Sequence, residues 1–151
     1  MVKQLELATV KAGCHPLEGF EIYWLFSRSQ VDFVFQELEL VKTEGGHDRA
    51  EFQGGMLPVI WLEKYFGLQR MEGRREPKYV VISGVSTAGE LTRIIFPAPH
   101  SLKLHKLESE LKPVPSFVLP EKSDDILGVY SLSKSKLAIV PDIGKITRFA
   151  V

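Results

Sequence analysis

The chain has 151 residues, of which 44% are apolar and 25% charged, the composition of an ordinary globular protein. Its 19 basic and 19 acidic side chains cancel, which argues against a nucleic-acid binder and against an electrostatic membrane anchor. The single cysteine, Cys14, excludes an internal disulfide framework. No apolar stretch is long enough to span a membrane, and the N-terminus lacks the apolar region of a signal peptide. We therefore expect a cytoplasmic protein.

The first half of the chain contains short apolar runs that are typical of β-strands. Residues 22–26 (IYWLF) and 31–35 (VDFVF) are rich in aromatic and β-branched side chains, and the four polar residues between them predict a hairpin. The polar segment 42–51 predicts an exposed loop. A further strand, 56–60, leads into residues with helical spacing that stop at Gly67.

The second half continues with strands separated by turn residues. Residues 79–83 and 91–96 predict two buried strands, and 126–132 with 137–140 predict a hairpin. Asp142 is a suitable N-cap for a short closing helix that begins at Ile143. This succession of short strands favours small β-barrels or a sandwich over a βαβ protein.

Two strand-to-helix junctions, 56–65 and 137–146, share one pattern, in which an apolar strand runs directly into a turn of helix. This weak repeat suggests two related lobes. We place the boundary between two small lobes in the charged segment 70–78 and assign residues 20–151 to one two-lobed domain. Residues 1–19 show little pattern, and their role is not indicated.

Motifs for chemistry are scarce. The chain has no phosphate-binding loop and no nucleophile elbow, and Asp124-Asp125 is typical of a solvated turn before a strand. Cys14, His15, His100 and His105 could be imagined as a zinc site, but a lone thiolate favours ordinary loop histidines. We therefore expect neither an enzyme nor a resident cofactor or metal.

Strand-borne aromatic residues are the most prominent feature. Residues 23–26 (YWLF) cannot all face one core, because alternate residues of a strand point to opposite faces. Either other parts of the protein cover both faces, or one face is a surface for a partner. The sequence is richer in binding surface than in reactive groups, which indicates a scaffold.

Five segments follow one another in a recognisable order: 51–68 (EFQGGMLPVIWLEKYFGL), 93–96 (RIIF), 111–115 (LKPVP), 126–132 (ILGVYSL) and 136–146 (KLAIVPDIGKI). Their order and spacing resemble the CheW-like family of bacterial chemotaxis coupling proteins, and the resemblance covers about residues 20–149. It implies a mainly β fold of two five-stranded, SH3-like β-barrels that share an apolar core. It also implies short helices after the strands that end near Ile60 and Val140.

The same resemblance implies a non-catalytic adaptor that couples a CheA-type histidine kinase to the cytoplasmic tips of methyl-accepting chemoreceptors, without nucleic acid or membrane insertion. The matching stretch supplies Phe52, Gln53, Gly54 and Met56 as partner-binding candidates, together with Val31 and Phe33 from the preceding strand. Phe52 and Met56 could equally be core residues.

The chain departs from the family pattern at three places. Gln53 stands where the family motif has arginine, Trp61 stands where it has aspartate, and segment 42–51 lacks the usual proline-containing insertion. These departures bear on receptor recognition more than on the fold. Two other functions stay open: a small ligand- or metal-binding β-barrel that uses the cysteine and histidines named above, and a homodimerising regulatory module outside chemotaxis.

Overall fold

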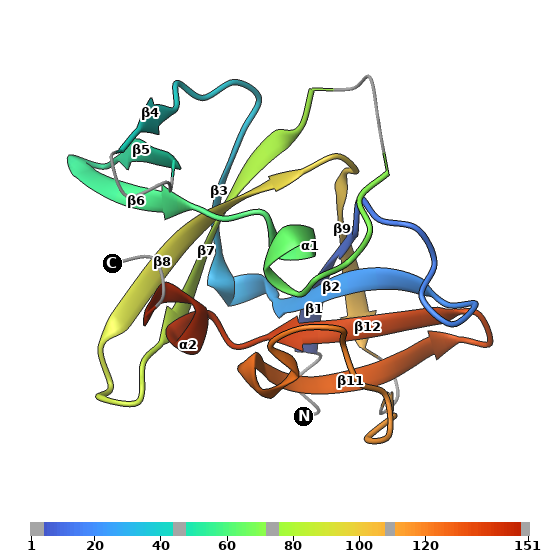
Figure 1. Cartoon of the computed structure of the whole chain (residues 1–151). Coiled ribbons are helices and arrows are strands. Elements are labelled where there is room, and N and C mark those ends of the chain that lie inside the picture. Colours follow the sequence, from blue (N-terminus) through green and yellow to red (C-terminus); the bar gives the residue numbers. More distant parts are fainter. Residues whose placement is uncertain (1–4, 44–47, 72–75, 108–110, 149–151) are drawn as a thin grey trace.

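The structure of the chain is a computed structural model that describes residues 5–43, 48–71, 76–107 and 111–148 (Figure 1). Within these ranges the strands form two six-stranded sheets, and the helices are short. No helix in the described ranges has the length and apolar character needed to cross a bilayer. The predicted mainly β fold is confirmed.

The first sheet has the strand order β3-β7-β8-β6-β5-β4, and its strands β4, β5 and β6 lie at the upper left of Figure 1. Its parallel pair is β6 with β8, and the other neighbours are antiparallel. Its strands are β3 (Val31–Phe35), β4 (Val41–Lys42), β5 (Asp48–Phe52), β6 (Gly55–Val59), β7 (Lys78–Val85) and β8 (Leu91–Ala98).

The second sheet, read from β9, has the order β9-β1-β2-β12-β11-β10. Here the parallel pair is β12 with β2. Its strands are β1 (Leu5–Lys11), β2 (Glu21–Ser27), β9 (Leu102–Leu107), β10 (Lys112–Pro113), β11 (Ile126–Ser133) and β12 (Lys136–Pro141). The two sheets therefore have the same sequence of hairpins and the same position for the parallel pair. The hydrogen-bonded ladders are open, with six strands each, rather than closed five-stranded barrels.

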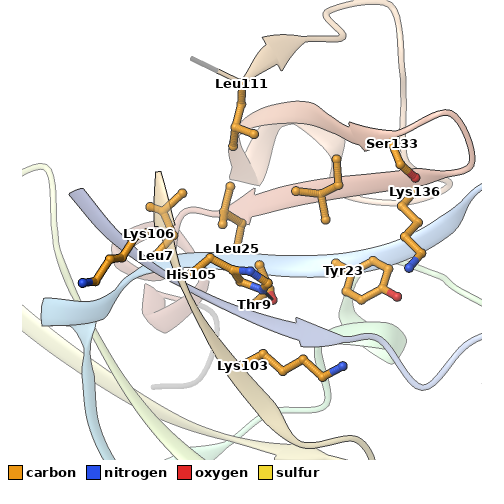
Figure 2. Close-up of a pocket in the computed structure, with 11 residues that line it drawn as sticks. Leu7, Thr9, Tyr23, Leu25, Lys103, His105, Lys106, Leu111, Ser133 and Lys136 are labelled. Carbon is orange, nitrogen blue, oxygen red and sulfur yellow. Dashed lines mark hydrogen bonds between the residues drawn. The ribbon is translucent and has the colours of Figure 1, made fainter. Parts of the chain in front are cut away.

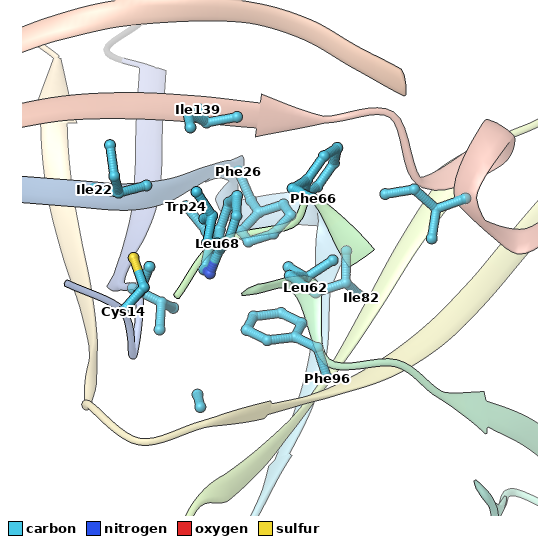
Figure 3. Close-up of a cluster of buried hydrophobic side chains, with 14 of the residues drawn as sticks. Cys14, Ile22, Trp24, Phe26, Leu62, Phe66, Leu68, Ile82, Phe96 and Ile139 are labelled. Carbon is cyan, nitrogen blue, oxygen red and sulfur yellow. The ribbon is translucent and has the colours of Figure 1, made fainter. Parts of the chain in front are cut away.

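The predicted shared core lies between the two sheets (Figure 3). Trp24 and Phe26 of β2 are fully buried there. The Trp24 ring contacts Phe66 and the Phe26 ring contacts Phe96, and the ring centroids in each pair are 5.6 Å apart. Burying a side chain of this size contributes about 1.5–3 kcal/mol. The odd and even residues of segment 23–26 are thus both covered by the protein, except that Tyr23 is half-buried.

Both predicted helices follow their strands. Helix α1 (Leu62–Tyr65) comes after β6, and Gly67, directly after its C-cap Phe66, has a φ of 71° that suits glycine. Helix α2 (Ile143–Arg148) comes after β12, and Asp142 caps it by accepting the backbone N–H of Lys145 at 3.2 Å. Each helix contributes buried apolar residues to the shared core.

The predicted hairpin between residues 22–26 and 31–35 is wrong. Strand β2 pairs with β1 and β12 in the second sheet, whereas β3 pairs with β7 in the first. The polar residues between them form the 3-10 turn η1 (Arg28–Gln30), where the Gln30 side chain accepts the Ser27 N–H and donates to the Ser83 carbonyl, both at 3.0 Å. This capped turn carries the chain from one sheet to the other.

Residues before position 20 form part of the same fold, because β1 lies between β2 and β9 in the second sheet. Of the boundary expected at 70–78, residues 72–75 lie outside the described residues. The described chain passes between the sheets at η1 and again between β8 and β9.

Candidate protein-interaction site

Strand β3 is an open edge of the first sheet. Within the described strands it pairs only with β7, and its three central residues, Asp32, Phe33 and Val34, are exposed. The Phe33 side chain is 51% exposed, although an aromatic side chain in water is costly. Natural edge strands are usually protected by charged side chains, proline, a bulge or a covering element. Strand β3 has one charged residue, Asp32, which forms an ion pair with Arg93 at 2.9 Å, and its ladder with β7 shifts register at this point. The exposed Phe33 and Val34 that follow are suited to binding another protein.

The Phe33 ring packs against two further phenylalanine rings. Its centroid lies 4.6 Å from that of Phe35 and 6.4 Å from that of Phe52, and Phe35 and Phe52 are in edge contact at 6.0 Å. This aromatic cluster (Phe33, Phe35 and Phe52) connects edge strand β3 to β5 across the curled sheet, where no ladder joins them. Because its neighbours hold the ring, Phe33 loses little further side-chain freedom when a partner covers it.

The β5–β6 hairpin carries the other predicted residues. Gln53 and Gly54 form its two-residue turn with φ angles of 50° and 81°, the pattern of a type I′ turn, and both are exposed. Phe52 is only 9% exposed and belongs to the interior cluster of the first sheet. Met56 is 46% exposed; it is paired with the exposed Glu51 and thus faces away from Phe52.

The structure therefore brings Phe33 and Phe52 together and places Gln53 and Gly54 directly after Phe52. Val31 is half-buried and packs against the shared core, so it supports the edge from behind. Sequence reasoning missed Phe35, the ring that joins Phe33 to Phe52. The alternation of phenylalanines in the segment 33–35 was the available signal, since residues two apart in a strand share a face.

Trp61, a departure from the family motif, lies at the N-cap of α1 and makes no side-chain cap. Its ring instead lies 3.8 Å from the guanidinium carbon of Arg70, a cation–π contact. At the junction from β12 to α2, Asp142 caps the helix with its side chain. The two helices thus begin by different means at equivalent positions of the fold.

The cysteine and histidines of the metal hypothesis are not brought together. Cys14 is buried in the shared core, and burial, with the nearby Glu63 carboxylate, raises the pKa of its thiol to about 11. The His105 ring nitrogen Nε2 lies 2.8 Å from the Thr9 hydroxyl on the second sheet. Across the described ranges, no three His, Cys, Asp or Glu side chains form a group that could hold a metal ion. A Cys–His metal site is therefore not supported.

Asp125 differs from its predicted solvated environment. It is 7% exposed because the 3-10 turn η2 (Ser123–Asp125) directs it toward α1, where the Tyr65 hydroxyl donates to its Oδ2 at 2.6 Å. Burial and this hydrogen bond to Asp125 raise the pKa of Tyr65. This hydrogen bond holds α1 against the turn before β11, so Tyr65 and Asp125 stabilise the fold.

No protein-family model matches the sequence, and no curated protein matches it either. Solved structures do. The crystal structure of the scaffolding protein TtCheW from Thermoanaerobacter tengcongensis superposes with a TM-score of 0.62, covering 95% of this chain and 87% of that chain at 15% sequence identity. The chain has a CheW-like fold. This confirms the expected fold, and the low identity fits a divergent sequence.

Proposed function

We propose that this CheW-like protein is a non-catalytic adaptor in chemotaxis-type signal transduction, which couples a CheA-type histidine kinase to the cytoplasmic tip of a methyl-accepting chemoreceptor. The observation that carries the proposal is the match to a scaffolding protein over 95% of the chain. A fold can host several functions, so the proposal also depends on the site. The apolar open edge at β3 offers such a site.

The partner would add a strand beside β3 or place an apolar pocket over Phe33. The unpaired backbone groups of an edge strand supply hydrogen bonds, and a ring half exposed on a rigid base supplies buried apolar area. Gln53, in the exposed turn next to Phe52, offers an amide where the family motif has a guanidinium. Recognition through this turn would therefore use neutral hydrogen bonds rather than a fixed positive charge.

Calorimetric titration of the full chain with a kinase regulatory domain, and separately with a receptor-tip fragment, tests the proposal. Phe33→Asp removes the ring from the edge, and we expect it to weaken binding of at least one partner by about tenfold or more. Leu127→Asp, at a residue of β11 that is 66% exposed on the other sheet, is the matched control and should leave affinity within about twofold.

Absence of binding to both partners at tens of micromolar would overturn the adaptor function. A concentration-dependent dimer in light scattering, abolished by Phe33→Asp and found without binding to either partner, would instead favour the homodimerising regulatory module. Equal effects of Phe33→Asp and Leu127→Asp would remove β3 as the binding edge.

A further inference from the structure

The curled face of the second sheet holds a cavity of about 490 Å³ that is open to solvent (Figure 2). Thr9 of β1 and Leu25 of β2 lie in its wall and are each only 4% exposed, so the cavity reaches into the body of the sheet. Ligand sites in proteins commonly have volumes of roughly 300–1,000 Å³ and combine apolar walls with a few polar groups. The cavity has this size and this depth.

The corresponding region of the first sheet is filled. There Val81 of β7 is paired with Ile95 on one side and with Phe33 on the other, and the interior is packed with apolar side chains that include Phe52. In the second sheet β1 occupies the position that β7 occupies in the first. Thr9 of β1, which is paired with Leu25 and with Lys103, therefore corresponds to Val81. A hydroxyl and an ammonium group thus replace two apolar side chains, and space remains where the first sheet has a core.

Charge at the cavity is of one sign in the described part of the chain. Lys103, Lys106 and Lys136 line it, and none of the three forms a salt bridge with a described carboxylate. Lys136 approaches the Tyr23 ring, with Nζ 5.6 Å from its centroid. Lys103 shares the sheet face of Thr9 and His105, whereas Lys106 is paired with Glu6 and points away from the cavity (Figure 2). The ammonium groups of Lys103 and Lys136 therefore favour an anion at the opening.

One polar contact inside the cavity orients a further donor. The Thr9 hydroxyl lies 2.8 Å from His105 Nε2, and when the hydroxyl donates to this nitrogen, the neutral ring carries its proton on Nδ1. The Nδ1–H group is then available to an acceptor. Four leucines, Leu7, Leu25, Leu111 and Leu132, make the wall largely apolar, and Tyr23 and Ser133 complete it.

We propose that this cavity binds an amphipathic carboxylate, a molecule with one carboxylate and one apolar chain, as in a medium-chain fatty acid. The chain would lie against the leucines, and the carboxylate would meet Lys103, Lys136 and the His105 ring. Such a ligand uses both halves of the lining, whereas a small inorganic anion would leave the apolar half empty and a hydrocarbon would leave the ammonium groups unused. The site lies on a different sheet from the β3 edge and is independent of the adaptor function.

Calorimetric titration of the full chain with decanoate tests the site, with decanol as the uncharged analogue and acetate as the analogue without a chain. We expect decanoate to bind about tenfold or more tightly than decanol and acetate not to bind. The double variant Lys103→Glu/Lys136→Glu should weaken decanoate binding by about tenfold or more. A matched double variant at exposed lysines away from the cavity, Lys42→Glu/Lys64→Glu, should change it by less than about twofold.

A variant that fills the cavity provides the second arm. Leu7 is half-buried and lines the opening, so Leu7→Trp should occupy the space and abolish decanoate binding while the thermal midpoint is maintained or raised. Amide shifts in NMR spectra should locate decanoate at Thr9 and Leu25. Failure of decanoate to bind, equal affinity for decanol, or unchanged binding in folded Leu7→Trp would each overturn the proposal.

Discussion

Glu63 Oε1 accepts the backbone N–H of Gly13 at 2.9 Å. The carboxylate is 1% exposed in α1, and the same oxygen lies 3.5 Å from the indole nitrogen of Trp24. Its second oxygen, Oε2, has no hydrogen-bond partner among the described residues. One side chain therefore joins the segment after β1, the shared core and the first helix, with half of its hydrogen-bonding capacity unused.

We expect Glu63→Ala to lower the free energy of unfolding by about 2–4 kcal/mol, because it leaves the Gly13 N–H unpaired and opens a cavity. Glu63→Gln keeps an oxygen for Gly13 and removes a buried charge, so its loss should be smaller, below about 1 kcal/mol. Urea denaturation of both variants measures the difference. Equal losses would show that the charge of Glu63, rather than its hydrogen bond, stabilises the fold.

Cys14 should make the stability of the protein depend on alkaline pH. Burial foremost, then Glu63, raises the pKa of the folded thiol from 9.0 to about 11, while Lys11 opposes the shift. The unfolded thiol ionises first, so the stabilisation is complete below pH 9 and is lost as the pH rises to 11. This loss amounts to about 2–3 kcal/mol at 1.36 kcal/mol for each pKa unit.

The difference in unfolding free energy between the wild-type chain and Cys14→Ala isolates this effect from the tyrosines and lysines that titrate in the same range. The difference should be constant from pH 6 to 8 and shrink between pH 9 and 11. A difference that stays constant to pH 11 would contradict the raised pKa.

Gly144 allows α2 to approach β7 closely. A Cβ atom at this position would lie 2.8 Å from the Val85 carbonyl carbon and 2.9 Å from Ser86 Cα. Alanine is the better helix former by about 1 kcal/mol. We nevertheless expect Gly144→Ala to destabilise the protein by about 2 kcal/mol, because backbone atoms cannot move aside as a flexible side chain can.

Gly89→Ala is the control for Gly144→Ala, since a Cβ at Gly89 meets nothing within 4 Å and its cost is limited to the strain of a φ of 80°. In thermal denaturation, Gly144→Ala should have a lower midpoint of unfolding than Gly89→Ala. The reverse order would mean that α2 is not held against the β7–β8 turn.

Gln53 adopts a left-handed backbone with a φ of 50° in the β5–β6 turn. Asparagine tolerates this conformation better, so Gln53→Asn should raise the free energy of unfolding by about 0.5–1 kcal/mol. Gln69→Asn, at an exposed position without a positive φ, should change it by less than about 0.5 kcal/mol. No gain at Gln53, or an equal gain at Gln69, would contradict the turn geometry.

Local signals in the sequence predicted the parts of the fold that local contacts determine. The helix after Ile60, the cap at Asp142 and the β11–β12 hairpin depend on neighbours in the chain, and all three are present. The pairing partner of a strand could not be predicted in this way, because period-two alternation indicates a strand but not the strand beside it. The wrong hairpin between residues 22–26 and 31–35 arose in this way.

The candidate site was predictable to the same extent. Phe33, Gln53 and Gly54 were named from the sequence, and all three are exposed. Phe33 lies on the open edge, and Gln53 and Gly54 follow Phe52, whose ring it contacts. The contact of Phe35 with Phe52 requires the curl of the first sheet, which no local pattern encodes. The cavity near Thr9 likewise depends on the register of β1 with β9, two strands far apart in the sequence.

The second sheet takes its strands from both ends of the chain, and this has a consequence for the order of folding. All six strands of the first sheet lie within one continuous stretch, 31–98, whereas the second sheet joins β1 and β2 to β9–β12, with Lys136 beside Glu21. During synthesis the first sheet can form while β2, with the buried faces of Trp24 and Phe26, still lacks its parallel neighbour. Pairing across so long a separation is slow, and β2 is an aggregation-prone edge in the nascent chain until β12 emerges.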